Sequence, residues 1–200
     1  PMGLDSMIFQ VGKLIVTVFL SGMGTSMMAA FSVANNITMF FEIPGSAMML
    51  LAVTLVGRSV GAGDDKAAKD EMLLTLAVNS VLFALICIPG YFLSYQMASL
   101  FSASEEVRQI AVDLVKIFCA LTPIMWAPGF MLPYGLRAAG DVKFTIICSS
   151  SILWLVRVPL SYVYGVVMNM GAVGIWWAMI ADWVARNILY MWRLLSDKWR

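Results

Sequence analysis

The chain has 200 residues, of which 61% are hydrophobic and 12% are charged, with a net charge of +1 and a mean hydropathy of +0.86. A soluble domain carries roughly 25% charged residues, so this composition excludes a water-soluble fold and indicates an integral membrane protein. A net charge close to zero gives no case for nucleic-acid binding.

Six apolar segments have about the ~20 residues that an α-helix needs to cross a bilayer. None of them shows the alternation of a barrel strand, so we predict an all-α membrane protein with a bundle of six transmembrane helices. Prolines inside several segments predict kinks rather than breaks. The approximate spans are 7–24, 33–56, 72–95, 110–132, 144–167 and 174–194.

Basic residues gather in alternate connections between these spans. Eight of them follow spans two, four and six, whereas the opposite connections hold only Arg108. The positive-inside rule therefore predicts a multi-pass protein of the cell membrane, with both ends of the segment in the cytoplasm. The eight are Arg58, Lys66, Lys69, Arg137, Lys143, Arg193, Lys198 and Arg200.

The connection after the second span, 56-VGRSVGAGDD-65, contains the glycine pattern G-x-x-x-G-x-G. A phosphate-binding glycine loop follows a strand and opens a helix, but this one follows an apolar span, so we reject a nucleotide site. We expect Gly57 and Gly61 to let helices approach closely. We expect Gly63 and Asp64 to turn the chain, with Arg58 anchoring the turn at the cytoplasmic face.

The same turn recurs 77 residues later as Gly140-Asp141. Each copy is preceded by an arginine (Arg58, Arg137) and followed by a lysine. The repeat predicts two helical hairpins that each turn through a left-handed glycine, with the aspartate capping the next helix.

Four stretches carry a resemblance to a known family. The runs 23-MGTSMMAAFSVANNI-37 and 44-PGSAMMLLAVTLVGRSVGAGD-64 resemble the seventh and eighth helices of the multidrug and toxic compound extrusion (MATE) transporters. Residues 135–165 resemble their helix 10 to helix 11 region, and residues 174–199 resemble their twelfth helix and tail. The whole of residues 1–200 thus resembles the second, C-terminal six-helix lobe.

The resemblance implies a twelve-helix transporter with the substrate cavity between two lobes. Its partners would be an N-terminal six-helix lobe, a small-molecule substrate, a coupling proton or sodium ion, and the lipid bilayer. Family members export amphipathic compounds, many of them cations, by alternating access, and we expect the same here. Three positions where members carry acidic residues match Gln10, Asn35 and Trp126 in this sequence, so we expect no carboxylate-based cation site in this lobe.

Polar and adaptable side chains within the spans are the candidates for the cavity wall. Amide side chains can equally form hydrogen bonds between helices, and methionines can pack against other apolar side chains. A structural role for each candidate therefore stays open. A tryptophan face at a position where relatives carry an acid would still suit a cationic substrate. The candidates are Gln10, Asn35, Asn36, Met39, Met125 and Trp126.

Four charged residues inside the spans are candidates for coupling or for structural pairing. Glu42 is a candidate for proton coupling, or for a pair with Lys13 or Arg157. Asp182 and Arg186 are four residues apart on one helix face, which favours a structural ion pair over a relay. Arg157 is expected to pair with Glu42 or Asp182, or to extend its side chain towards the interface.

Other functions remain as alternatives to an antiporter lobe. A lipid or glycan-lipid flippase would need basic residues in the cavity, and the residues considered for that role are Lys13, Arg157 and Arg186. A membrane-embedded enzyme would need clustered catalytic groups, but no histidine is present, and we expect neither an enzyme nor a cofactor. The cysteines Cys87, Cys119 and Cys148 have no metal-site spacing and are interpreted as core residues. A structural membrane subunit is the last alternative.

Overall fold

The protein forms six continuous helical runs over the residues that the computed structural model describes, 2–101 and 104–199. This confirms the predicted all-α fold. The first three runs are α1 (Met2–Ser21), α2 (Thr25–Gly61) and α3 (Asp65–Phe101). The fourth run joins α4 (Glu105–Trp126), η1 (Ala127–Met131) and α5 (Leu132–Ala138), and the fifth joins α6 (Val142–Ile152), η2 (Leu153–Arg157), α7 (Val158–Tyr162) and η3 (Val163–Val167). The last is α8 (Gly171–Leu195).

Four of these runs, Thr25–Gly61, Asp65–Phe101, Glu105–Ala138 and Val142–Val167, are long and apolar enough to cross a membrane. Within α1 the apolar part, Gln10–Ser21, is shorter. The helices also extend beyond several predicted spans. At 1.5 Å per residue, the 37 residues of α2 and of α3 make rods of about 55 Å, longer than a bilayer core of about 30 Å.

Two wider, π-helical segments with prolines in or next to them, η1 and η2, occur at the functional site. The π-helical segment η1 contains Pro128 and is followed by Pro133, and η2 is followed by Pro159. Proline has no N–H to donate to the preceding turn, and a π-helical turn accommodates that loss. The predicted kinks therefore take this form in the fourth and fifth runs, whereas Pro44, Pro89 and Pro123 lie within α-helix.

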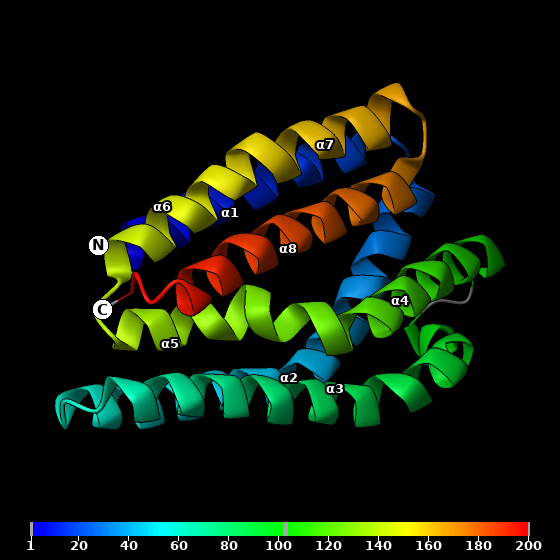
Figure 1. Cartoon of the computed structure of the whole chain (residues 1–200). Coiled ribbons are helices and arrows are strands. Elements are labelled where there is room, and N and C mark those ends of the chain that lie inside the picture. The colour runs from blue at the N-terminus through cyan, green and yellow to red at the C-terminus, as the bar shows by residue number, and fades with distance from the viewer. Residues whose placement is uncertain (1, 102–103, 200) are drawn as a thin grey trace.

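The helices pack as two groups (Figure 1). In one group α3 packs along both α2 and α4, and α5 packs on α2. In the other, α1 and α8 both pack on the run that contains α6 and α7. Contacts of α8 with α4, η1 and α2 join the groups, so α8 is the central helix of the bundle.

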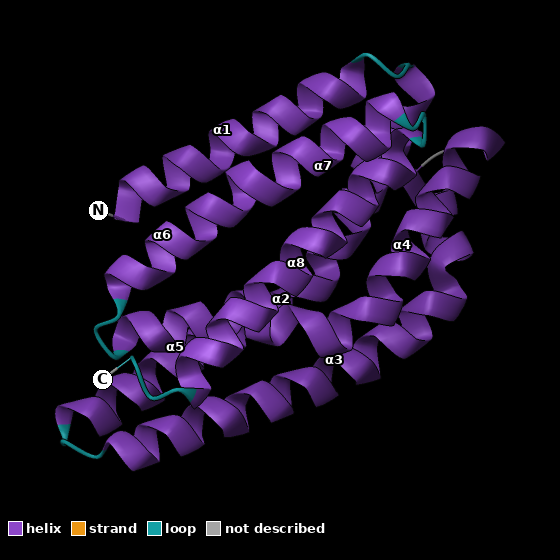
Figure 2. Cartoon of the chain, turned by 45° about the horizontal axis from the view of Figure 1, so that its top comes forward, coloured by secondary structure: helices purple, strands orange, loops and turns teal. Residues whose placement is uncertain are grey.

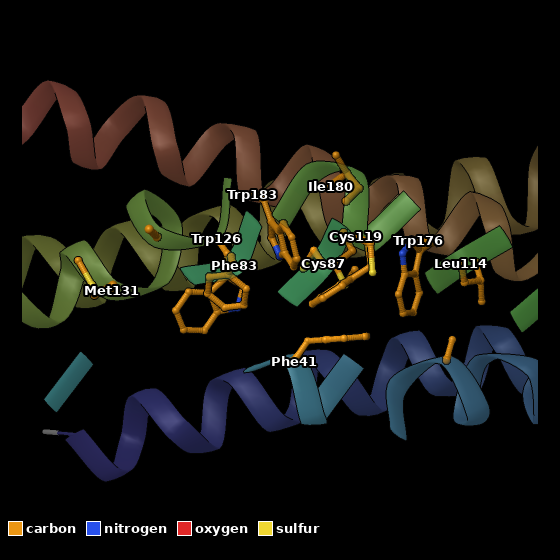
Figure 3. Packing of buried hydrophobic residues seen from close by; sticks show 14 of the residues in the cluster. Phe41, Phe83, Cys87, Leu114, Cys119, Trp126, Met131, Trp176, Ile180 and Trp183 are labelled. Atoms are coloured by element: carbon orange, nitrogen blue, oxygen red, sulfur yellow. The ribbon is translucent and has the colours of Figure 1, made fainter. Parts of the chain in front are cut away.

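The core between the groups is rich in aromatic rings and sulfur (Figure 3). Phe41 and Phe83 of α2 and α3 approach Trp183 of α8 through intervening rings. Cys87 and Cys119 are buried in this core, and Cys148 is buried between α6 and its neighbours. All three thiols are free, as the interpretation of core cysteines predicts.

The two predicted turns have matching backbone geometry. Gly63 has φ of 76° and Gly140 has φ of 98°, in the left-handed region that favours glycine. Around each glycine the backbone amides donate to equivalent earlier carbonyls, displaced by 77 residues. Directly after the glycine, Asp64 N–H donates to the Ser59 carbonyl and Asp141 N–H donates to the Leu136 carbonyl. The repeat read from the sequence is therefore present in the backbone.

The aspartates of the two turns differ. The Asp64 carboxylate accepts a hydrogen bond from the Ala67 amide at 2.9 Å and caps α3, as predicted. Asp141 precedes α6 but makes no side-chain cap; its carboxylate instead accepts bonds from Arg193 of α8, at 2.7 and 3.2 Å. The cap predicted for Asp141 is thus wrong, because a charged donor from α8 occupies the oxygens.

The prediction that Gly57 and Gly61 bring helices together is also wrong within the described chain. A Cβ at either position would meet no atom within 4 Å. Close approaches occur at other glycines, for example at Gly45, where a Cβ would come within 2.6 Å of Trp126. Arg58 is exposed at this end and lies 3.6 Å from Glu71 of α3.

Both termini lie at the same end of the bundle as the α2–α3 and α5–α6 turns (Figures 1 and 2). At this end Arg193 pairs with Asp141, and Lys69 pairs with Asp197 at 2.7 Å. The connections that carry most of the basic residues are therefore on one side of the molecule.

Replacing Gly140 by alanine is expected to lower the free energy of unfolding by about 1 kcal/mol, because an L-residue is strained at this φ. The matched control is Gly57→Ala, which adds a methyl group to a helix without meeting a neighbour and should leave stability unchanged or raise it by up to about 1 kcal/mol. Thermal unfolding of the complete protein in detergent measures both. Equal effects of the two substitutions would contradict the assignment of the left-handed turn.

Candidate functional site

A cavity of about 490 Å³ opens between the two helix groups. Five segments line it: α1, α2, the α4–η1 junction, η2 and α8. The site is thus built at the contact of helices that are far apart in the sequence, and both widened segments η1 and η2 contribute to it.

One face of α2 supplies much of the wall. Its lining positions recur every three or four residues, which is the spacing of side chains that share one helix face. The polar members form a stripe of Asn35, Thr38, Glu42 and Ser46 on an otherwise apolar helix. Two of these hydroxyls donate to backbone carbonyls of the same helix, from Thr38 to Asn35 and from Ser46 to Glu42.

Aromatic rings form another part of the wall. Trp126 stacks on Phe130 with ring centroids 5.5 Å apart, and Phe130 meets Trp183 edge-on at 5.5 Å. All three rings line the cavity. Gly45 lies directly behind Trp126, and its missing side chain leaves the space that the indole occupies. Met39, Met49 and Met179 add flexible apolar surface.

Three charged side chains line the same cavity: Lys13, Glu42 and Arg157. The Glu42 carboxylate is near enough to Lys13 and Arg157 for their positive charges to act on it, and the Trp126 indole lies near it. A carboxylate at this depth of a membrane protein is stabilised by such partners, because lipid offers none. The two basic residues considered as its partners from the sequence, Lys13 and Arg157, thus line the same cavity as Glu42.

Behind the cavity wall lies a buried arginine–aspartate cluster. Asp182 is fully buried and accepts two hydrogen bonds from Arg186, both at 3.1 Å. The guanidinium of Arg157 lies 4.0 Å from the same carboxylate. Arg186 also donates to the Ser149 carbonyl at 3.2 Å and lies over the Phe130 ring. The i,i+4 ion pair between Asp182 and Arg186 that the spacing predicts is present. Asp182 also lies close to a second arginine, Arg157.

Some of the predicted cavity residues line the cavity and others do not. Asn35, Met39 and Trp126 line the cavity together with Glu42 and Arg157. Asn36 faces a separate shallow apolar groove that Met39 also borders. Gln10 is exposed on α1, and Met125 is half-buried against the core. Neither of these two is among the side chains that line the cavity.

Sequence reasoning missed several lining residues, among them Thr38, Ser46, Phe130 and Trp183. The polar spacing 35, 38, 42, 46 along one apolar helix was a signal that could have identified Thr38 and Ser46. Nothing comparable marked Phe130 and Trp183, since aromatic residues in a span are equally common in the core and at the interface.

The arrangement can hold an amphipathic molecule. Rings and thioethers would pack against its apolar body, while Lys13, Glu42 and Arg157 would meet its polar group. Within the part of the chain that the structure describes, no three His, Cys, Asp or Glu side chains are close enough together to hold a metal ion.

An all-helical bundle with four apolar spans and a charged cavity between its helices is a multi-pass membrane protein. The chain belongs to the MatE family, whose profile matches residues 1–163. This is a family of transporters and not of enzymes. The family resemblance found in the sequence is thereby confirmed.

Relatives and solved structures agree with this assignment. The chain is 28% identical to the uncharacterized transporter YisQ of Bacillus subtilis over 199 residues, which is 100% of this chain and 44% of that protein. It is 28% identical to the multidrug resistance protein NorM of Aliivibrio fischeri, over 90% of this chain and 40% of that one. The chain thus spans less than half the length of these relatives.

Two solved structures show the same fold. A transporter of the MOP superfamily from Pyrococcus furiosus, described as having a binding pocket of reverse polarity, matches with a TM-score of 0.89 at 17% identity, over 98% of this chain and 43% of that one. A multidrug resistance MATE transporter in an outward-facing conformation matches with a TM-score of 0.85 at 15% identity, over 98% of this chain and 45% of that one.

The Asp182→Asn substitution is expected to lower the free energy of unfolding by about 3–5 kcal/mol, since it leaves Arg157 and Arg186 buried without their carboxylate. The control is Asp197→Asn, which removes a partly exposed pair with Lys69 and should cost less than about 1 kcal/mol. Thermal unfolding in detergent compares them. A loss at Asp182 no larger than at Asp197 would show that the cluster does not stabilise the bundle.

Proposed function

We propose that this chain is the second, C-terminal six-helix lobe of an antiporter that exports amphipathic small molecules by alternating access. The cavity between the two helix groups carries the proposal, because it joins an aromatic and methionine wall to charged groups at membrane depth. Relatives named for multidrug resistance support the same role. In this proposal an N-terminal six-helix lobe of the same transporter completes the cavity, and residues 1–200 form one lobe.

Protons or sodium ions drive the proposed exchange. Glu42 is the carboxylate of this lobe that faces the cavity, so it is our candidate for a proton-linked group, whereas the buried Asp182 is held by arginines and has the structural role. A sodium site would then belong to the other lobe, in keeping with the neutral Gln10, Asn35 and Trp126. We further propose that both ends of this segment face the cytoplasm, which the shared location of the termini and basic turns supports.

A lipid or glycan-lipid flippase is a second candidate, and one observation favours it. Two of the basic residues considered for a flippase, Lys13 and Arg157, line the cavity. Such residues suit the anionic head group of a lipid. The expectation of a cationic substrate stays a prediction, and a lining with two basic groups and one carboxylate gives it no support.

Transport by the complete protein in reconstituted vesicles tests the antiporter role. We expect export of an amphipathic dye that depends on a proton or a sodium gradient and stops when both are dissipated. Ethidium and 8-anilinonaphthalene-1-sulfonate, one cationic and one anionic, should both be tried.

Trp126→Ala should reduce that export about five- to tenfold, because it removes a large part of the aromatic wall. Trp192→Ala is the matched control, since Trp192 is half-exposed near the end of α8 and contacts Lys198. Dye movement that ignores both gradients, or equal effects of the two tryptophans, would argue against the antiporter.

A further inference from the structure

Two carboxylates from different helices act on Arg157. This arginine ends the π-helical segment η2, and its side chain is 7% exposed and lines the cavity. Glu42 of α2 lines the same cavity, and its negative charge acts on Arg157. Behind the wall, the guanidinium lies 4.0 Å from the carboxylate of Asp182 on α8. The position of such an arginine depends on the charges of both carboxylates.

The two arginines near Asp182 are held very differently. Arg186 donates two hydrogen bonds to the carboxylate at 3.1 Å and a third to the Ser149 carbonyl at 3.2 Å. The 4.0 Å separation of Arg157 is too long for a hydrogen bond, and in the described part of the chain its guanidinium makes this ion pair and no hydrogen bond. Arg157 is therefore the arginine of this cluster that can move without breaking a hydrogen bond.

Of the two carboxylates, Glu42 is the one whose charge can change. It lines the cavity, whereas Asp182 is fully buried and hydrogen-bonded to Arg186. The charged groups that act on Glu42 are Lys13 of α1 and Arg157 of η2. A proton on Glu42 removes its attraction for both cations. Arg157 then keeps one carboxylate partner, Asp182, and is drawn towards it.

The backbone at Arg157 links this side chain to the helix packing. The Val158 amide donates to the Leu153 carbonyl, five residues earlier, which is the bond of a π-helical turn. Pro159 follows directly and has no N–H to donate. The segment η2 packs on α8, so a shift of Arg157 between its two carboxylates acts on the contact of these two helices.

From these observations we infer that Arg157 is a positioning residue that couples the charge of Glu42 to α8. With Glu42 ionised, the guanidinium is shared between Glu42 and Asp182. With Glu42 protonated, it pairs with Asp182 and withdraws from the cavity, so that one proton changes both the cavity wall and the η2–α8 contact. This inference rests on the proposed function, of which it specifies how a proton is coupled to transport.

Nitrogen NMR of isotope-labelled arginine side chains in the complete protein in detergent tests the movement directly. The Arg157 signal is the one that Arg157→Lys removes. We expect it to shift when the wild type is acidified, because the guanidinium exchanges one carboxylate for a closer contact with the other. Glu42→Gln is neutral at every pH, so it should give the acidic position of the signal throughout and abolish the response to pH.

Glu106→Gln is the matched control. Glu106 is exposed at the start of α4, where it accepts a hydrogen bond from Ser26 at 3.2 Å, and it is not among the cavity residues. This substitution should leave the response of the Arg157 signal unchanged. An Arg157 signal that ignores acidification in the wild type, or that still responds to it in Glu42→Gln, would overturn the inference.

Transport by the complete protein in vesicles separates coupling from structure. Arg157→Gln is expected to lower proton-driven export of the dye that the wild type carries by about fivefold or more, as loss of a typical coupling free energy implies. Exchange of labelled for unlabelled dye without a gradient needs no coupling and should stay within about twofold. Arg157→Lys keeps the positive charge and should keep most of the driven export.

Three outcomes of the transport experiment would contradict the role of Arg157. They are an equal loss of driven export and of exchange, no loss of either, and export by the wild type that only sodium drives. The last outcome keeps the antiporter and overturns the inference alone. A wild type that ignores both gradients contradicts the antiporter itself, and the Arg157 signal then decides whether the charge of Glu42 reaches this arginine.

Discussion

The carboxylate of Asp182 is the constraint on which the centre of the bundle depends. A fully buried charge in a membrane protein must be neutralised by the protein itself, because neither water nor lipid can do so. Arg186 on the same helix supplies the close pair, and Arg157 on the fifth run supplies the second. Two side chains of α8 also donate hydrogen bonds to backbone carbonyls of α6. Arg186 donates to the Ser149 carbonyl, and the Tyr190 hydroxyl donates to the Thr145 carbonyl. One buried carboxylate thus fixes α8 against α6 and η2.

The fixed α8 determines the shape of the cavity. Arg157 ends the π-helical segment η2, and the change in helix phase there decides which face its side chain occupies. Across the cavity η1 follows Trp126 directly and contains Phe130, so the second widened segment shapes the aromatic wall. Prolines next to both segments remove backbone donors that a regular α-helix would need. The two π-helical segments, η1 and η2, therefore position both the aromatic wall and the buried Arg157.

The sequence was sufficient for features that depend on neighbours along the chain. Six helices, two glycine turns 77 residues apart and the Asp182–Arg186 pair follow from length, spacing and turn chemistry, and the structure has all of them. Features that depend on which face of a helix meets another were not accessible in the same way. Asn35 and Asn36 are adjacent and equally polar, but residues one apart on a helix point about 100° away from each other, so only one of them lines the cavity. Gly57 and Gly61 have the small-residue spacing of a helix contact, but within the described residues a Cβ at either position would have no atom within 4 Å.

A solved structure shares the fold of this chain at low sequence identity. A TM-score of 0.89 at 17% identity means that the backbone is retained while most side chains differ. Turn glycines and neutralised buried charges are requirements of the backbone and the bilayer, so they are expected to follow the fold. The lining of a cavity faces a ligand rather than the fold, and a change from one charge to another there costs the bundle little as long as the buried cluster keeps its pairs. The polarity of this cavity must therefore be argued from Lys13, Glu42 and Arg157 themselves, because family membership alone does not determine the charge of the substrate.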